Sequence, residues 1–181
     1  HLAAAPDARS FAGLAFAWIT VADGRHPDLK APPATLLLAD FAGAAPRQHP
    51  LPAAGQDLAW LADSSAVIVA LGDGAVHRVT RDGATTEIDR FAAPATSLAV
   101  APDGRWLAAG SEDGSLHLHD LRTGRVRPLP AHGERVTALA FTADGTWLAS
   151  GCADHTARLW RSDDASFRAF DEGGHGVEQL A

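Results

Sequence analysis

Three residue types that hydrolases combine lie in the last third of this sequence: His132, Ser150 and Asp154. Such a set can carry acyl transfer, but only with an exposed nucleophile and an oxyanion hole. Two more imidazoles, His117 and His119, lie two residues apart, which on a strand places them on one face. A metal site needs a third ligand, which this pair does not supply, so we predict no metal. The chemistry of both sets depends on the elements that position them.

The segments that carry these residues recur along the chain. Residues 97–110 match residues 138–151 at a constant offset of 41, including an Asp-Gly pair and a Trp-Leu pair. A weaker copy at 58–77 matches at an offset of 40, and residues 2–9 and 36–40 form an earlier, split copy. A fixed period of this length is typical of folds that repeat one supersecondary unit.

Each unit consists of short extended segments with turns between them. In the last full unit we predict strands at 136–141, 147–152 and 156–160, and residues 167–170 can supply a fourth. The Asp-Gly pairs suit tight turns, because glycine accepts positive φ and aspartate bonds its own backbone. Helical repeats would show apolar spacings of three and four, which are missing. We therefore expect an all-β fold of β-propeller blades, each with four antiparallel strands.

The segment 131–160 resembles a WD40 repeat. It has a histidine before the first strand, an Asp-Gly turn, a Leu-Ala-Ser-Gly strand and a third strand that ends in tryptophan, although Ala131 and Arg161 replace the family's usual glycine and aspartate. The resemblance implies about four blades and the start of another. Their approximate bounds are 1–54, 55–94, 95–135 and 136–176, with the next blade beginning at 177–181.

Both ends of the chain fall in the same part of the repeat, because Leu2 and Leu180 occupy equivalent positions. WD-repeat rings typically have more than four blades. We therefore expect a part of a larger propeller, which additional blades or a second copy of the chain would complete.

By the same resemblance, four residues form the structural hydrogen-bond tetrad of the family: His132, Ser150, Asp154 and Trp160. A buried carboxylate needs donors, an imidazole can link it to a hydroxyl, and an indole supplies only its N–H. The repeat therefore accounts for the serine, histidine and aspartate without catalysis. We predict no catalytic residue, no cofactor and no enzyme activity.

The third blade departs from this pattern. Phe91, Ala109 and His119 stand where the fourth blade has its histidine, serine and tryptophan. The turn aspartates Asp73 and Asp113 are retained, and we predict that they hold their turns. We expect the second and third blades to depend more on apolar packing than on polar networks.

The period breaks once, in the first unit, where Asp7 to Asp40 spans 33 positions against 17 for Asp103 to Asp120. The 16 added residues lengthen a hairpin with its tip near 22–34. Strands alternate direction, so this hairpin and the inter-blade loops emerge at one end, which is the usual partner-binding face of WD-repeat proteins. A neutral decoration is the alternative, because long surface loops are tolerated. The predicted contact residues are Arg25, His26, Lys30, Glu112, Glu134, Arg135 and His155.

Composition limits the classes of partner. The net charge is −7 and the basic residues are scattered, which argues against a nucleic-acid binder. No apolar run reaches the roughly 20 residues of a membrane helix. The one cysteine, Cys152, cannot form an internal disulfide. No signal-peptide pattern opens the chain, and we expect a cytoplasmic location.

These observations favour a non-catalytic scaffold that binds protein or peptide partners. One alternative is a structural propeller segment of a larger multidomain protein. Another is a small-ligand-binding or enzymatic propeller, which would need polar side chains on the innermost strands, directed at the axis. Those strands contain Leu98-Ala-Val and Ala138-Leu-Ala-Phe, which supply almost none.

Overall fold

The computed structural model of the chain describes residues 2–7, 10–15, 35–40, 47–164 and 166–171. Every regular element in these ranges is a β-strand, and the strands form four separate sheets. No helix that could cross a membrane occurs in the described part of the chain. The expected all-β fold is confirmed.

Each sheet contains four consecutive antiparallel strands in sequence order. The first sheet holds β1 (Leu2–Ala4), β2 (Ser10–Ala15), β3 (Thr35–Asp40) and β4 (Arg47–Pro50). The second holds β5 (Gly55–Trp60), β6 (Ala66–Leu71), β7 (Ala75–Thr80) and β8 (Thr85–Arg90). The third holds β9 (Ala95–Val100), β10 (Trp106–Ser111), β11 (Leu116–Asp120) and β12 (Arg125–Leu129). The fourth holds β13 (Val136–Phe141), β14 (Trp147–Cys152), β15 (Thr156–Arg161) and β16 (Phe167–Asp171).

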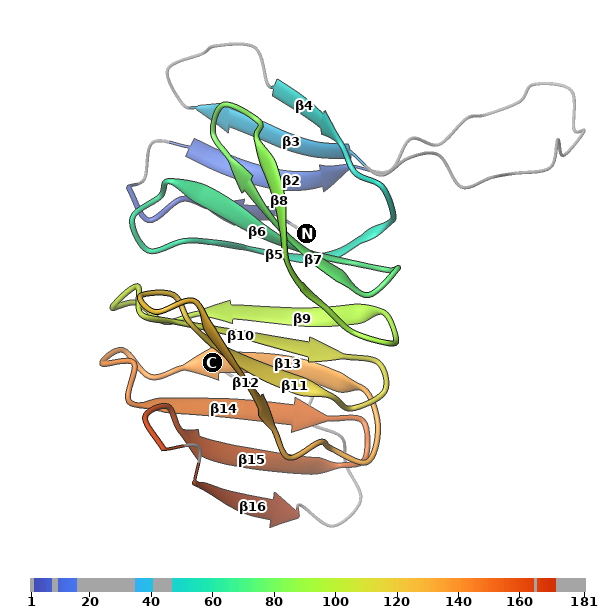
Figure 1. Cartoon of the computed structure of the whole chain (residues 1–181), viewed down its shortest axis with the longest axis vertical. Helices are drawn as coiled ribbons and strands as arrows, with labels where there is room; N and C mark the ends of the chain where they lie inside the picture. The colour runs from blue at the N-terminus through green and yellow to red at the C-terminus, as the bar shows by residue number, and fades with distance from the viewer. Residues whose placement is uncertain (1, 8–9, 16–34, 41–46, 165, 172–181) are drawn as a thin grey trace, which may run out of the picture.

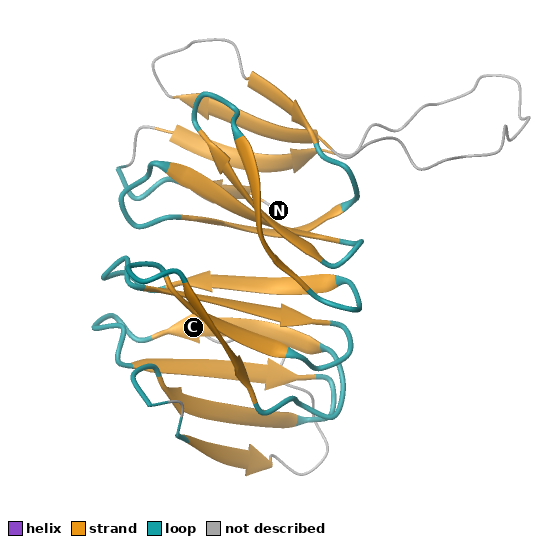
Figure 2. Ribbon diagram, in the orientation of Figure 1, coloured by secondary structure: helices purple, strands orange, loops and turns teal. Residues whose placement is uncertain are grey.

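The four sheets lie one after another in chain order (Figure 1). Their first strands adjoin: β1 lies beside β5, β5 beside β9, and β9 beside β13. The fourth strand of each sheet forms the opposite edge, and the loops gather at the two ends of the strands (Figure 2). This is the arrangement of propeller blades, so the sheets are called blades 1 to 4.

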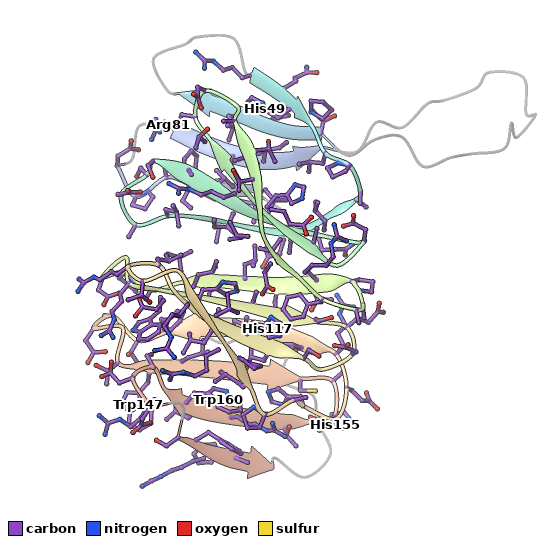
Figure 3. The ribbon with its side chains drawn as sticks, in the orientation of Figure 1. His49, Arg81, His117, Trp147, His155 and Trp160 are labelled. Atoms are coloured by element: carbon purple, nitrogen blue, oxygen red, sulfur yellow. The ribbon has the colours of Figure 1, made fainter. Side chains whose placement is uncertain are left out.

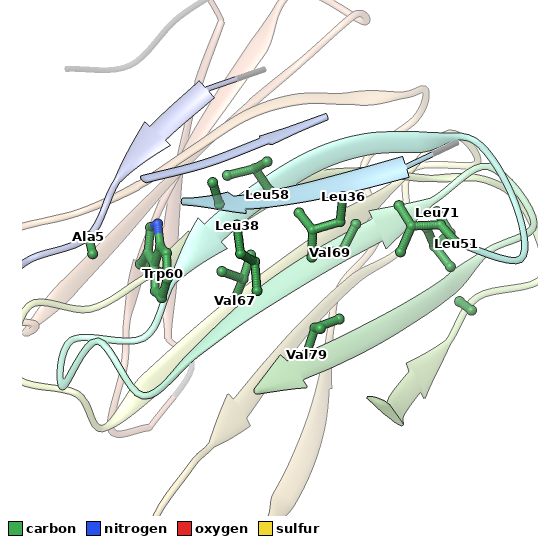
Figure 4. Close-up of a cluster of buried hydrophobic side chains, with 12 residues drawn as sticks. Ala5, Leu36, Leu38, Leu51, Leu58, Trp60, Val67, Val69, Leu71 and Val79 are labelled. Atoms are coloured by element: carbon green, nitrogen blue, oxygen red, sulfur yellow. The ribbon is translucent and has the colours of Figure 1, made fainter. Parts of the chain in front are cut away.

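Strand β6 shows why the blades pack on both faces. All six of its residues are buried, and alternate residues belong to two different apolar clusters. One set packs with Leu36 and Leu38 of blade 1 (Figure 4), and the other with Leu107 and Ala109 of blade 3. The first set is Val67, Val69 and Leu71, and the second is Ala66, Ile68 and Ala70. A strand covered on both faces must be apolar throughout, unlike a half-exposed strand.

Backbone hydrogen bonds at one end of the blades repeat with the sequence period. The carbonyl of each turn glycine between the second and third strands accepts the N–H of a residue in the following inter-blade connection. The pairs are Phe91 with Gly74 and His132 with Gly114, both with N···O distances of 2.9 Å. The repeat therefore fixes the connection that carries His132 into blade 4.

Candidate functional site

The residues of the predicted tetrad lie in one chain of hydrogen bonds in blade 4, which is buried at Ser150 and Trp160 and partly buried at Asp154. His132 Nε2 lies 2.8 Å from Ser150 Oγ, and the indole N–H of Trp160 donates to the same oxygen at 2.8 Å. His132 Nδ1 lies 3.3 Å from the hydroxyl oxygen of Thr156, which donates to Asp154 Oδ1 at 2.6 Å. The chain thus runs from the indole to the carboxylate through a threonine that the sequence reasoning missed.

The number of available protons assigns the direction of each bond. The indole N–H of Trp160 can only donate, so Ser150 Oγ accepts from it and passes its own proton to His132 Nε2. The neutral imidazole then carries its proton on Nδ1 and donates to Thr156, which donates in turn to Asp154. Every polar hydrogen in the chain has an acceptor, as a buried polar network requires.

Asp154 is held as a carboxylate at the end of this chain. Besides the hydroxyl of Thr156, the backbone N–H groups of Thr156 and Gly133 donate to it at 3.0 and 2.9 Å. Burial raises the pKa of Asp154, but these donors outweigh burial and hold the pKa well below its usual range. The carboxylate therefore fixes both the turn after β14 and the connection before β13.

The same geometry limits what the tetrad can do chemically. Ser150 and Trp160 are each 0% exposed and His132 is 4% exposed, so the serine hydroxyl has no access to a substrate in solution. An acyl-transfer nucleophile must be exposed. The arrangement suits a structural link between the inter-blade connection and β14 and β15, and this role remains our prediction.

Four of the predicted partner contacts lie on adjoining loops at one end of the blades. Glu112, Glu134, Arg135 and His155 are all exposed, and Figure 3 shows His155 at a loop end. The N–H of Ala153 donates to the carbonyl of Arg135 at 2.9 Å, which joins two of these loops directly. The turn aspartates at this end accept backbone N–H groups within their turns: Asp73 from Ala75 at 3.2 Å and Asp113 from Ser115 at 3.0 Å.

The hairpin insertion leaves blade 1 at this same end. Its supporting strands β2 and β3 pair up to Ala15 and Thr35, and Thr35 pairs with Pro50 just before the connection to blade 2. The tip residues Arg25, His26 and Lys30 lie outside the described residues. The described residues therefore show only that the insertion leaves from the end of blade 1 formed by Ala15 and Thr35.

Comparison with known proteins agrees with this architecture. The sequence model of the WD domain, G-beta repeat, matches residues 87–120 and 124–161, and no curated protein matches the chain. The fold is similar to a chain in the crystal structure of the mitotic checkpoint complex, with a TM-score of 0.72 and 21% identity over 81% of this chain and 47% of that one. The first match runs from within β8 to the end of β11, and the second from the turn before β12 to the end of β15. Residues 87–120 and 124–161 therefore match WD40 repeats, and the described blades have the fold of a WD40 propeller segment.

Two further solved structures share the WD40 fold. They are described as the structure of U3-55K, with a TM-score of 0.66 and 18% identity, and the crystal structure of RRP9 WD40 repeats, with a TM-score of 0.64 and 17% identity. Each alignment covers 71% of this chain and 42% of the other chain. The chain therefore spans less than half the length of these WD40 structures.

Blade 3 contains a polar network that we did not predict. Oδ2 of Asp89, on β8 of blade 2, lies 2.7 Å from His117 Nδ1 and 2.8 Å from His119 Nε2, both on β11. The expectation that blades 2 and 3 depend more on apolar packing than on polar networks stays a prediction, and blade 3 contains this polar link beside its apolar clusters. In place of the tetrad, blade 3 has a hydrogen-bonded link to the preceding blade, because the His119 ring lies within hydrogen-bond distance of Asp89 across the blade boundary.

The innermost strands also carry one acidic residue that the sequence reasoning missed. The Asp57 carboxylate, on β5, accepts the backbone N–H of Leu58 at 2.8 Å and that of Leu98 on β9 at 2.9 Å. Burial raises the pKa of Asp57 above its usual value, although these two bonds oppose the change. Asp57 thus ties blade 2 to blade 3, and the signal in the sequence was its place next to Leu58, which the repeat offset of 40 matches to Leu98.

A pocket of about 740 Å³ lies between blades 2 and 3. Its apolar lining includes Ile68, Ile88 and Val126, and its polar lining includes Arg78 and His119. The pocket therefore reaches the network around Asp89 through His119.

Acidification is expected to destabilise the fold through His132. Burial lowers the pKa of His132 from 6.5 to about 4, the nearby charge of Arg158 adds to this, and Asp154 opposes it. Between pH 6.5 and 4 the unfolded chain binds a proton that the folded chain does not, so stability falls as pH falls. We expect a loss of about 2 kcal/mol between pH 7 and 4.5, measured by urea unfolding.

The variant His132→Gln provides the control for this prediction. We expect it to be less stable at neutral pH, but it lacks the titrating imidazole, so its stability should change less over the same interval. An identical pH dependence in the two proteins would show that His132 is not the responsible group.

Proposed function

We propose that this chain is a non-catalytic scaffold that binds a protein or peptide through the loop face defined by Glu112, Glu134, Arg135 and His155. The WD40-repeat family is generally non-catalytic, and one of the similar solved structures is a protein complex. The observation that carries the proposal is the exposure of these four side chains on adjoining loops of blades 3 and 4. Asp154, the one acidic residue of the tetrad, is occupied by hydrogen bonds from Thr156 and Gly133, so partner binding is left to the exposed side chains.

The backbone beneath this face is held in a way that suits the binding of a partner. The carbonyl of Glu134 accepts from the thiol of Cys152 at 3.0 Å, and the N–H of Glu112 donates to the carbonyl of Pro94 at 2.9 Å. These bonds hold the loop backbone while leaving the charged side chains in solvent. A rigid backbone with exposed charges lowers the entropy lost on binding and lets the charges select a partner.

Charge reversal on the two ends of the blades tests the proposed face. The partner is first captured on the immobilised chain and identified, and its affinity is then measured for two variants. Glu112→Lys with Glu134→Lys should weaken binding at least about tenfold, as expected when complementary charges become repulsive. Arg122→Glu with Arg125→Glu, at the opposite end of blade 3, should leave the affinity unchanged. The reverse pattern would place the binding face elsewhere.

Deleting residues 22–34 from the same protein separates the two interpretations of the hairpin. A loss of affinity supports a wall on the binding face, and an unchanged affinity makes the insertion a neutral decoration.

A further inference from the structure

Three side chains that can bind metal ions converge between blades 2 and 3. One oxygen of Asp89 lies within 2.8 Å of a ring nitrogen of both His117 and His119. The three donor atoms all lie within 4.8 Å of one another. Asp89 is 28 residues before His117 and belongs to another blade. The fold thus supplies the third ligand that the two histidines lacked in the sequence.

The surrounding backbone directs these side chains to one point. His117 and His119 are two residues apart on β11 and therefore share a face of the sheet. The pairing of β7 with β8 shifts register just before Asp89, and such a bulge re-aims the side chain that follows it. Phe91 stacks on the ring of His117, with centroids 4.4 Å apart and an interplanar angle of 25°, which restrains the imidazole.

The cluster differs from blade 4 at each of its positions, and in blade 2 the offset of 40 retains only His117, as His77. In blade 4, an offset of 41 places Pro130, Arg158 and Trp160 at these positions, and none of them is a metal ligand. There Arg158 joins the blades by donating to the carbonyls of Pro130 and Ala131, both at 2.8 Å. A link between blades is therefore possible without ligand residues, and the repeat itself does not account for two histidines and an aspartate together.

The environment of the cluster keeps the carboxylate charged and accessible. Burial raises the pKa of Asp89, but hydrogen bonds from His117 and His119 outweigh it and hold the pKa well below its usual range. The side chains of Asp89 and His117 are 10% and 22% exposed, so the site is sheltered without being closed. His119 also lines the pocket between the blades, which provides a path for a small ion.

We propose that Asp89, His117 and His119 bind one divalent transition-metal ion of the Zn²⁺ class, which joins blade 2 to blade 3. Two imidazole nitrogens and one carboxylate oxygen are the donor set that such ions prefer, with water in the fourth position. Bonds of about 2.0–2.1 Å require donor atoms ~3.3 Å apart, so the carboxylate withdraws by about 0.5 Å. Each ring proton that faces Asp89 moves to the other nitrogen of its imidazole, because the metal binds the unprotonated nitrogen.

Calorimetric titration of the tag-free, EDTA-treated chain with ZnCl₂ tests this site. We expect one Zn²⁺ per chain with micromolar affinity, and a rise in Tm because the ion binds only the folded state. Asp89→Asn and His119→Gln should each weaken binding at least about tenfold. His155→Ala, which removes an exposed histidine outside the cluster, should leave the affinity unchanged. The absence of saturable binding below about 100 µM Zn²⁺ would overturn the proposal.

A second trio, His132, Cys152 and Asp154, also has its donor atoms within 4.8 Å of one another. The experiment must therefore show which of the two trios binds the metal ion. Burial raises the pKa of Cys152, which keeps its thiol protonated and weakens it as a ligand. Cys152→Ala should therefore retain Zn²⁺ binding, and loss of binding in that variant alone would contradict our assignment. If Asp89→Asn fails to fold, the visible spectrum of bound Co²⁺ in wild type and in His117→Gln provides the same comparison, and identical spectra would overturn the proposal.

Discussion

Replacing Gly114 with alanine is expected to lower the free energy of unfolding by about 3 kcal/mol or more, from two additive causes. Gly114 has φ +84°, and a left-handed backbone conformation costs a residue with a Cβ about 1–2 kcal/mol. A Cβ at this position would also lie 2.4 Å from the carbonyl oxygen of His132 and 2.8 Å from that of Glu134. Both are backbone atoms, so the clash is relieved only by moving the inter-blade connection.

That connection is the one that carries His132 into blade 4. The N–H of His132 donates to the carbonyl of Gly114 at 2.9 Å, so a displaced connection weakens this bond and the tetrad beyond it. The expected loss of stability in Gly114→Ala therefore involves both blade 3, which contains Gly114, and blade 4, which contains the tetrad.

Gly124 is the matched control for this substitution. It has φ +71°, but a Cβ there would meet nothing within 4 Å. In Gly124→Ala the free energy of unfolding should fall only by the cost of the left-handed backbone conformation, about 1 kcal/mol. Urea unfolding of both variants, followed by tryptophan fluorescence, measures the difference. Equal losses would mean that the close approach of the connection does not contribute to stability.

The sequence predicts the local elements of this fold well because each of them is specified by nearby residues. Predicted strands at 136–141 and 147–152 coincide with β13 and β14, and the strand predicted at 156–160 ends one residue before the end of β15. Strand alternation and Asp-Gly turns are short-range signals, and the repeat presents them several times in the same phase.

Contacts between blades were less predictable, because they depend on which residues face each other across a boundary. Of the residues that link Asp89 to His117 and His119, only His117 has a counterpart in blade 2, which is His77. The repeat alignment therefore does not predict the link. Thr156 is a different case. Ser115 stands at the equivalent position in blade 3, and a hydroxyl two residues after the turn aspartate in both blades could have suggested a bridge between the aspartate and the histidine.

Replacing Trp160 with alanine is expected to lower the free energy of unfolding by about 3–5 kcal/mol, the usual cost of deleting a buried indole. Trp160 is 0% exposed and packs in the apolar cluster that contains Leu118 and Leu148. Its ring also lies 4.5 Å from that of Phe167 on β16 (Figure 3 labels Trp160). The loss therefore combines apolar transfer, a cavity between blades 3 and 4, and a missing donor to Ser150.

The variant Trp160→Phe separates the hydrogen bond from the packing. It retains most of the apolar surface but removes the indole N–H, which leaves one acceptor site of buried Ser150 unfilled at a cost of about 1–3 kcal/mol. Trp147→Ala is the control for a tryptophan in the same blade: its ring is only partly buried and lies beside Arg161, so its loss should be smaller. Urea unfolding followed by far-ultraviolet circular dichroism measures all three variants. If Trp160→Phe were as stable as the wild type, the tetrad would contribute through packing alone, and the hydrogen-bond chain from Trp160 to Asp154 would have no energetic role.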